Sequence, residues 1–115
     1  MSIEWDTEYN YGLSYASVTP GVKNLIDQGY HWFISDMDIA SEFECKGEEF
    51  LVFKLITDLK KQTAVAYIED GNENVLYKQK YYYTDSKMKE VKVWKTGKVI
   101  LLPEEYWENE RNELN

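Results

Sequence analysis

The sequence predicts an α+β domain in which two helices precede an antiparallel meander of about five strands and a C-terminal helix follows it. Three observations support this fold class. Apolar residues recur at helical spacing between positions 20 and 43, apolar and polar residues alternate in short segments between positions 49 and 102, and glycine-containing turns separate several of these segments. No repeat, low-complexity tract or linker divides the chain, so we expect a single domain over residues 1–115, with residues 1–11 and 108–115 frayed.

The two helices are predicted from their start and stop signals. The motif from Thr19 to Gly21 favours a helix start, because threonine can cap free amide groups and proline suits the first turn. Gly29 is expected to end this short helix. The apolar spacing over residues 30–43 predicts a second helix directly afterwards, with a strand as the alternative for its first residues.

The strands are predicted from runs of β-branched and aromatic residues. They are expected at residues 50–56, 63–69, 75–84, 91–94 and 99–102. The motif Asp70 to Asn72 and the segment 95–98 are typical of hairpin turns. Pro103 is expected to end the sheet and to open the last helix, over residues 104–113, whose first turn carries carboxylates.

At 115 residues the chain is long enough to build a core without a metal or a disulfide, and 16% of its residues are aromatic. We assign Trp32, Phe50, Phe53 and Trp94 to that core. Five further aromatic residues lie near the ends of the chain: Trp5, Tyr9, Tyr11, Tyr106 and Trp107. They could tether the termini or contact a second subunit, so a homodimer remains open.

Charge is strongly segregated along the sequence, whose net charge is −8. Residues 1–49 are rich in carboxylates, residues 78–98 are rich in lysine, and residues 99–115 are acidic again. An overall acidic protein is repelled by phosphate backbones and anionic membranes, so we expect neither nucleic acid nor a membrane as the direct ligand. The single cysteine, Cys45, and the absence of a basic, apolar leader lead us to expect a cytoplasmic protein.

No group of residues prescribes a reaction, and we therefore expect a protein that is not an enzyme. His31 is the only histidine, and no serine near it in sequence has the setting of a catalytic nucleophile. The pairs Asp36/Asp38 and Glu42/Glu44 lack the spacing and glycine of a calcium loop, and no phosphate-binding glycine motif occurs. We expect no metal and no cofactor.

The lysine-rich block allows a second interpretation. Aromatic and basic residues interleave on its strands, which resembles a single-stranded nucleic-acid platform: Tyr77, Tyr81, Tyr82, Tyr83 and Trp94 with Lys78, Lys80, Lys92 and Lys95. We favour an ordinary sheet whose lysines protect its solvent face.

Six segments resemble a family of small bacterial and mobile-element domains of unknown function. They are Thr19 to Leu25, Tyr30 to Asp36, Phe50 to Leu55, Asp70 to Asn72, Tyr83 to Asp85 and Leu101 to Tyr106. The resemblance covers about four fifths of the chain. Pro20, Phe33 and the pair Ser86-Lys87 depart from the family pattern, and the resemblance assigns no catalytic residue.

These observations lead to the hypothesis of an acidic protein that binds another macromolecule. The most concrete version is a phage or mobile-element inhibitor, similar to an anti-CRISPR protein, that occupies the basic nucleic-acid-binding surface of a host protein. The expected partner-binding residues are Glu4, Asp6, Glu8, Asp36, Asp38, Glu42, Glu44, Glu48 and Glu49. The alternative is a housekeeping regulatory or small-ligand-binding module.

Overall fold

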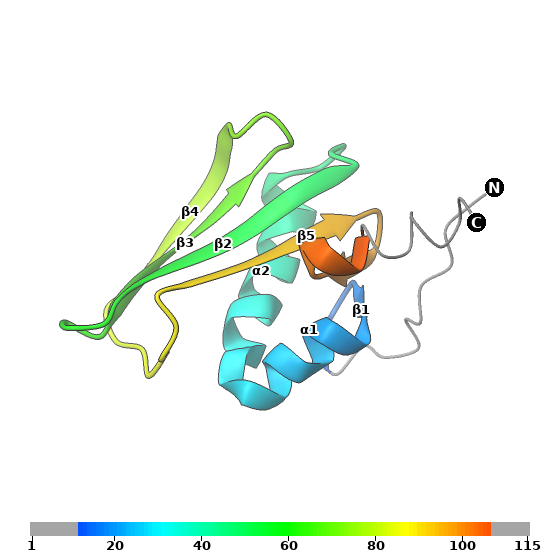
Figure 1. Ribbon diagram of the computed structural model, residues 1–115. Coiled ribbons are helices and arrows are strands. Elements are labelled where there is room, and N and C mark those ends of the chain that lie inside the picture. Colours follow the sequence, from blue (N-terminus) through cyan, green and yellow to red (C-terminus); the bar gives the residue numbers. More distant parts are fainter. Residues whose placement is uncertain (1–11, 107–115) are drawn as a thin grey trace.

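Helices pack against one face of a six-stranded sheet in the computed structural model, which describes residues 12–106 (Figure 1). The elements are β1 (Ser17–Val18), α1 (Pro20–Leu25), a π-helical turn η1 (Ile26–Tyr30), α2 (His31–Glu44), β2 (Phe50–Asp58), β3 (Thr63–Glu69), β4 (Val75–Tyr81), β5 (Glu90–Thr96) and β6 (Val99–Leu101). A helical turn follows at residues 103–106. The predicted α+β class is confirmed.

The chain bends between the two helices at Gly29, as the sequence predicts. Its φ of 102° lies in the left-handed region, which a glycine adopts without steric cost. The start of α1 is held differently from the expectation, because the Thr19 side chain makes no capping bond. Glu105, distant in sequence, accepts hydrogen bonds from the Gly21 amide at 3.0 Å and from the Thr19 hydroxyl at 2.5 Å.

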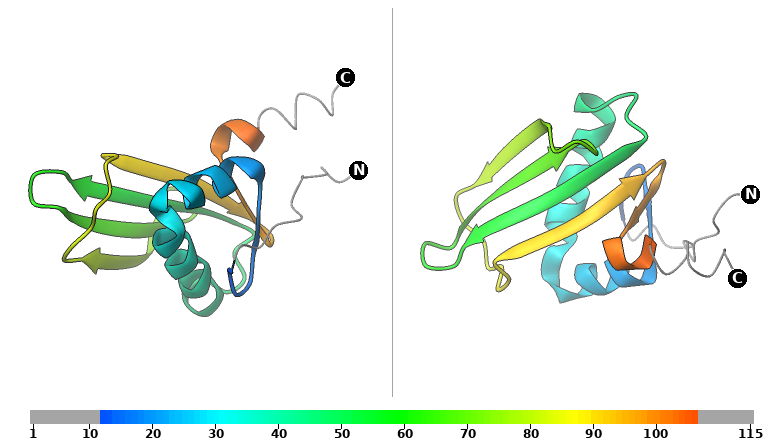
Figure 2. Two further views of the ribbon diagram at one scale, coloured as in Figure 1. Left: turned by 90° about the horizontal axis from the view of Figure 1, so that it is seen from below. Right: turned by 45° about the horizontal axis from the view of Figure 1, so that its top comes forward.

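The strand order is β1-β6-β5-β2-β3-β4, so the sheet is not the simple meander that the sequence suggests. β2, β3 and β4 are consecutive antiparallel neighbours, but β5 pairs with the opposite side of β2. β1, which the sequence analysis missed, pairs in parallel with β6 at the far edge. The chain therefore crosses the end of the sheet between β4 and β5, as Figure 2 shows.

The connection that makes this crossing, residues 82–89, is held against the end of the sheet. The Thr84 amide donates to the Gln62 carbonyl and the Thr57 amide to the Lys89 carbonyl, both at 2.9 Å. Ser86 is buried and its hydroxyl lies 2.9 Å from that of Tyr30. These local bonds anchor the connection across β2 and β3, where a tight hairpin would have kept β5 beside β4.

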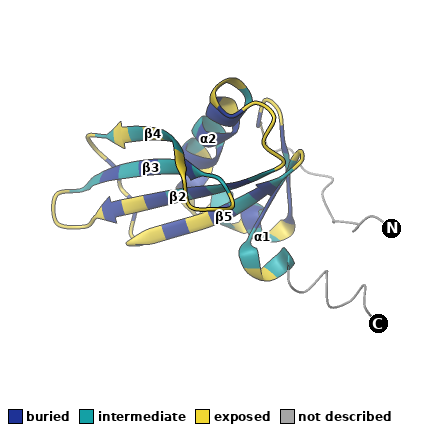
Figure 3. Cartoon of the chain, turned by 90° about the horizontal axis from the view of Figure 1, so that it is seen from above, coloured by how far each residue is buried: buried dark blue, intermediate teal, exposed yellow. Residues whose placement is uncertain are grey.

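Buried and exposed residues alternate along β2 and β5, and Figure 3 shows this alternation along the strands. The helix-facing side carries the core, including Phe53, which is fully buried. Two other expected core residues, Phe50 and Trp94, lie on the opposite face and are only partly buried. Their rings meet edge to face at 5.2 Å, and Trp94 meets Tyr106 at 5.7 Å. Phe50 and Phe53 are an odd number of positions apart, so their side chains lie on opposite faces of β2. Trp94 lies on the same face as Phe50, and these residues form an aromatic cluster separate from the core.

Candidate functional site

An apolar patch is exposed on the outer side of α2. Phe43 is 62% exposed and Ile39, one helical turn before it, is 40% exposed. Tyr15, 41% exposed, meets the Phe43 ring edge to face with centroids 6.1 Å apart. We call these three residues the Phe43 patch. Single exposed apolar side chains are ordinary, but adjacent ones are typical of contact surfaces.

A groove of about 280 Å³ lies between α2 and strand β4, next to this patch. Ile39 and Phe43 line it from the helix, and Tyr77 and Gln79 line it from the strand. Carboxylate-bearing residues also line it, since Asp36 and Glu44 belong to the same groove. The groove thus combines an apolar floor with negative charge.

The groove lies next to a hydrogen bond between the helix and the strand. The Tyr81 hydroxyl donates to Asp36 Oδ2 at 2.7 Å, and the Tyr81 ring contacts Trp32 edge to face at 4.8 Å. Burial, together with the neighbouring Asp36 carboxylate, raises the pKa of Tyr81 far above its ordinary value. Tyr81 therefore keeps its proton and fixes the position of Asp36.

Asp38 was expected to face a partner, but it is fully buried between α2 and the sheet. Its Oδ1 atom lies 3.6 Å from Nζ of Lys95, and its Oδ2 accepts a hydrogen bond from the Tyr15 amide at 2.9 Å. Asp36 and Asp38 point in different directions because neighbours two positions apart lie on different sides of a helix. The prediction that Asp38 contacts a partner is wrong for this reason.

Glu42 is partly neutralised by two lysines. Its Oε1 lies 3.2 Å from Nζ of Lys98 and 3.6 Å from Nζ of Lys95. Burial alone would raise the pKa of Glu42, but the hydrogen bond and charge of Lys98 and the charge of Lys95 hold it below its ordinary value. Glu42 is therefore a weaker candidate for contact with a partner.

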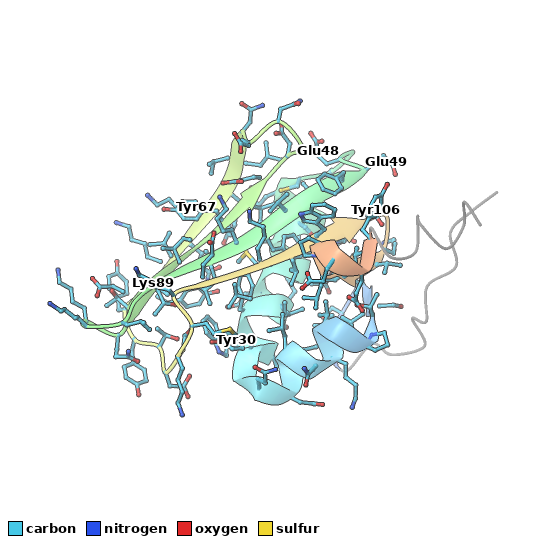
Figure 4. All side chains as sticks on the ribbon, viewed as in Figure 1. Tyr30, Glu48, Glu49, Tyr67, Lys89 and Tyr106 are labelled. Carbon is cyan, nitrogen blue, oxygen red and sulfur yellow. The ribbon has the colours of Figure 1, made fainter. Side chains whose placement is uncertain are left out.

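Glu44, Glu48 and Glu49 are exposed at the end of α2 and the start of β2. Figure 4 shows Glu48 and Glu49 together at one end of the sheet. The other expected residues, Glu4, Asp6 and Glu8, lie outside the residues that the structure describes. Within the described part of the chain, the predicted acidic surface thus reduces to these three glutamates with Asp36 at the groove.

The lysine-rich block is divided between the two faces of the sheet. Lys95 is buried on the helix-facing side, and the register places Tyr77 and Tyr81 on that side as well. Lys78 and Lys92 project from the open face, where Lys78 lies 5.9 Å from the centre of the Tyr67 ring. Figure 4 shows Tyr67 on this face. The interleaved sequence therefore does not form one aromatic and basic platform.

The nucleophile candidates on α2 and beyond it have structural partners. Lys95 Nζ donates to the Ser41 hydroxyl at 2.7 Å, and Ser86 bonds the Met88 carbonyl at 3.1 Å. Burial and the negative charges of Glu44 and Glu48 raise the pKa of the Cys45 thiol.

Among residues 12–106, no group of three or more metal-ligating side chains could hold a metal ion. In the same range, no helix combines the length and apolarity needed to cross a membrane.

Sequence reasoning missed the buried ion pair, although the pattern contained a signal for it. Lys95 continues the alternation of Val91 and Val93, both of which face the core. A lysine at an inward position requires a carboxylate partner, and Asp38 is the buried carboxylate on the facing helix. The groove beside β4 carried no such signal, because it depends on strand order.

Comparison with known proteins adds a family but no activity. A family model described as "Family of unknown function (DUF6876)" matches residues 4–106. No curated protein and no solved structure matches the chain.

Proposed function

The chain belongs to the DUF6876 family of unknown function, and from its surface we propose that it is a non-enzymatic protein that binds a partner protein with a basic surface. The binding surface consists of the Phe43 patch together with Glu44, Glu48 and Glu49. The more specific version of this proposal is an inhibitor, carried by a phage or mobile element, that acts in the host cytoplasm. Its partner is then a nucleic-acid enzyme whose basic groove it occupies.

The observation that carries the proposal is the exposure of Phe43 beside carboxylates. Full burial of a phenylalanine stabilises a protein by roughly 2–3 kcal/mol, and Phe43, which is 62% exposed, does not contribute much of this free energy to folding. Protein interfaces typically have an aromatic or aliphatic centre surrounded by polar and charged groups. Ile39, Phe43 and Glu44, which line the same groove, have this composition.

The glutamates support a basic partner rather than an acidic one. Exposed interfacial charges mainly set the association rate and its dependence on salt, whereas buried apolar contacts slow dissociation. A surface of exposed carboxylates presents the same sign of charge as a phosphate backbone, which is why we extend the proposal to nucleic-acid-binding grooves.

The test compares two charge-reversed variants with the same net charge. The first carries Glu44→Lys, Glu48→Lys and Glu49→Lys, and the control carries Asp85→Lys, Glu90→Lys and Glu104→Lys, all at exposed positions. The wild-type chain is used to capture proteins from its native host at low and at high salt, with identification by mass spectrometry. Affinity and salt dependence are then measured with the purified captured protein.

We expect the first variant to lose binding at least tenfold, the control to bind nearly as wild type, and added nucleic acid to compete. Equal binding by both variants would remove the glutamates from the proposal. Unchanged binding by Phe43→Ser would remove the Phe43 patch, and a captured partner with an acidic surface would overturn the proposal as a whole.

A further inference from the structure

Strand β4 forms one edge of the sheet, and no strand among residues 12–106 pairs with its outer side. It is seven residues long, whereas β1 at the opposite edge has two. A long edge strand presents unpaired backbone N–H and C=O groups that can pair with another chain. Figure 1 shows β4 as the outermost strand of the sheet.

The groove beside β4 is placed to receive the side chains of an added strand. Neighbouring strands lie about 4.8 Å apart, so a strand added to β4 would extend the sheet over the groove and direct every second side chain toward Ile39 and Phe43. The inward side chains of β4 that line this groove, Tyr77 and Gln79, are uncharged. The groove side of this edge therefore lacks the inward-pointing charge that many proteins use to block edge pairing.

The length of the groove limits the length of the segment. Along α2, the eight-residue separation from Asp36 to Glu44 corresponds to about 12 Å. Along β4, the distance from Tyr77 to Tyr81 corresponds to about 13 Å. An extended segment of about five residues fits these dimensions.

Charge on the two sides of β4 specifies the segment's chemistry. Lys78 and Lys80 lie on the open face, because the register pairs them with Tyr67 and Val65, whose side chains are on that face. An added strand should therefore present acidic or neutral residues there. On the groove side, Asp36 and Glu44 favour basic residues at the ends of an apolar stretch. A second copy of this chain fits less well, because paired β4 strands would gather four lysines on one face.

We propose that β4 binds an extended segment of the partner by strand addition, with alternate apolar side chains of that segment inserted between Ile39, Phe43 and Tyr77. The inference rests on the proposed function, since it takes the Phe43 patch as the partner-binding surface. It adds the backbone conformation of the bound segment and its residue pattern. Backbone pairing supplies affinity in this mode, and the alternate side chains supply specificity.

The test uses synthetic nine-residue peptides and the full chain. In the first peptide the central five residues match the length of the groove and carry leucine at their three inward positions. Lysine occupies the next inward position beyond each end of this central segment, from which its long side chain can reach back toward Asp36 or Glu44, and the outward positions are glutamate. A second peptide has the same composition in scrambled order. A third and a fourth carry N-methyl groups on the odd-numbered and on the even-numbered residues, so that each has a different backbone edge that cannot pair. Binding is measured by fluorescence anisotropy, and the bound site is mapped by hydrogen exchange of the backbone amides.

We expect the alternating peptide to bind at least tenfold more tightly than the scrambled peptide, and at least one N-methyl pattern to abolish binding. Exchange of β4 amides should slow about tenfold on binding. Phe43→Ser should weaken binding, whereas the control Leu59→Ser, at a position 42% exposed in the hairpin between β2 and β3, should not. Circular dichroism establishes that both variants are folded.

Strand addition would be overturned if the scrambled peptide or both N-methylated peptides bound as tightly as the first peptide, or if the protected amides lay away from β4. Concentration-dependent protection of β4 without peptide would assign this edge to a second copy and would also overturn it. These results are separate from the charge-reversal experiment. If the wild-type chain does not bind the peptide, but reversal of the three glutamates still abolishes binding of the protein partner, strand addition is refuted and the proposed function is not.

Discussion

Lys95 on β5 and Asp38 on α2 form an ion pair in the interface between the sheet and the helix, with Nζ and Oδ1 3.6 Å apart. Both side chains are almost completely buried. Lys95 also donates to Ser41 at 2.7 Å, and Asp38 accepts from the Tyr15 amide at 2.9 Å. The pair thus connects the sheet, the helix and the segment before β1, and it places Tyr15 beside Phe43.

Removing one member of this pair should destabilise the protein strongly. Lys95→Met leaves the buried Asp38 carboxylate without its counter-charge, and the expected loss is about 3–5 kcal/mol. The double variant Lys95→Met/Asp38→Asn should recover part of this loss, because the amide is neutral and retains an acceptor for Tyr15. Urea unfolding of the wild type, both single variants and the double variant measures the coupling. Additive effects would mean that the two groups do not interact.

Glu42 should make the stability depend on pH in the acidic range. Its pKa in the folded state is lowered from 4.5, so its contribution is present above the unfolded value and is lost as pH falls through the folded value. Wild type should therefore lose more stability than Glu42→Gln on acidification below about pH 4.5. The measurement is urea unfolding at a series of pH values. As a control, adding Lys98→Met to the Glu42→Gln variant should leave the pH dependence of its stability unaltered. The prediction would be contradicted if the stability of the wild type and of Glu42→Gln fell equally steeply with falling pH.

Gly21→Ala should destabilise the protein, although alanine usually stabilises a helix relative to glycine by about 0.5–1 kcal/mol. An added Cβ would lie 2.7 Å from Leu102 Cδ1 and 2.8 Å from Glu105 Cδ. It would push away the carboxylate that accepts the Gly21 amide at 3.0 Å. Thermal unfolding should show a lower midpoint for Gly21→Ala and for Glu105→Ala, with less than additive loss in the double variant. A higher midpoint for Gly21→Ala would show that the helix end moves freely.

Local features of the fold could be predicted from the sequence because they depend on neighbouring residues. The bend between the two helices at Gly29 follows from the left-handed backbone that glycine adopts readily, and the strand over residues 63–69 follows from simple alternation. Strand order depends instead on how residues 82–89 attach to Gln62 and Thr57, which are distant in sequence. No local pattern contains that information.

The candidate site was predicted only in part for a related reason. The acidic residues of α2 could be identified from the sequence, but the directions of their side chains could not. Asp36 and Asp38 are two positions apart on the helix, and their partners, Tyr81 and Lys95, come from strands that are distant in sequence. The prediction of exposed carboxylates holds for Glu44 and fails for Asp38. Phe43 is the last apolar residue of the spacing over residues 30–43 that predicts the second helix, and only the packing shows that it is exposed.

The bond between Tyr81 and Asp36 should make the stability depend on pH in the alkaline range. The pKa of Tyr81 is raised in the folded state by burial and by the Asp36 carboxylate, whereas the unfolded chain ionises near the ordinary value of 10.0. A raised folded pKa contributes stability that is present below about pH 10 and is lost as pH rises. Tyr81→Phe removes the ionising group, so the stability of this variant should fall less steeply above pH 10 than that of the wild type.

Near neutral pH the same variant should lose about 1 kcal/mol of stability, because Asp36 loses its hydrogen-bond donor. Urea unfolding at neutral and alkaline pH measures both effects, with Tyr82→Phe, at a position 85% exposed, as the control. An equal alkaline loss in the wild type and Tyr81→Phe would show that Tyr81 ionises as readily in the folded chain as in the unfolded chain.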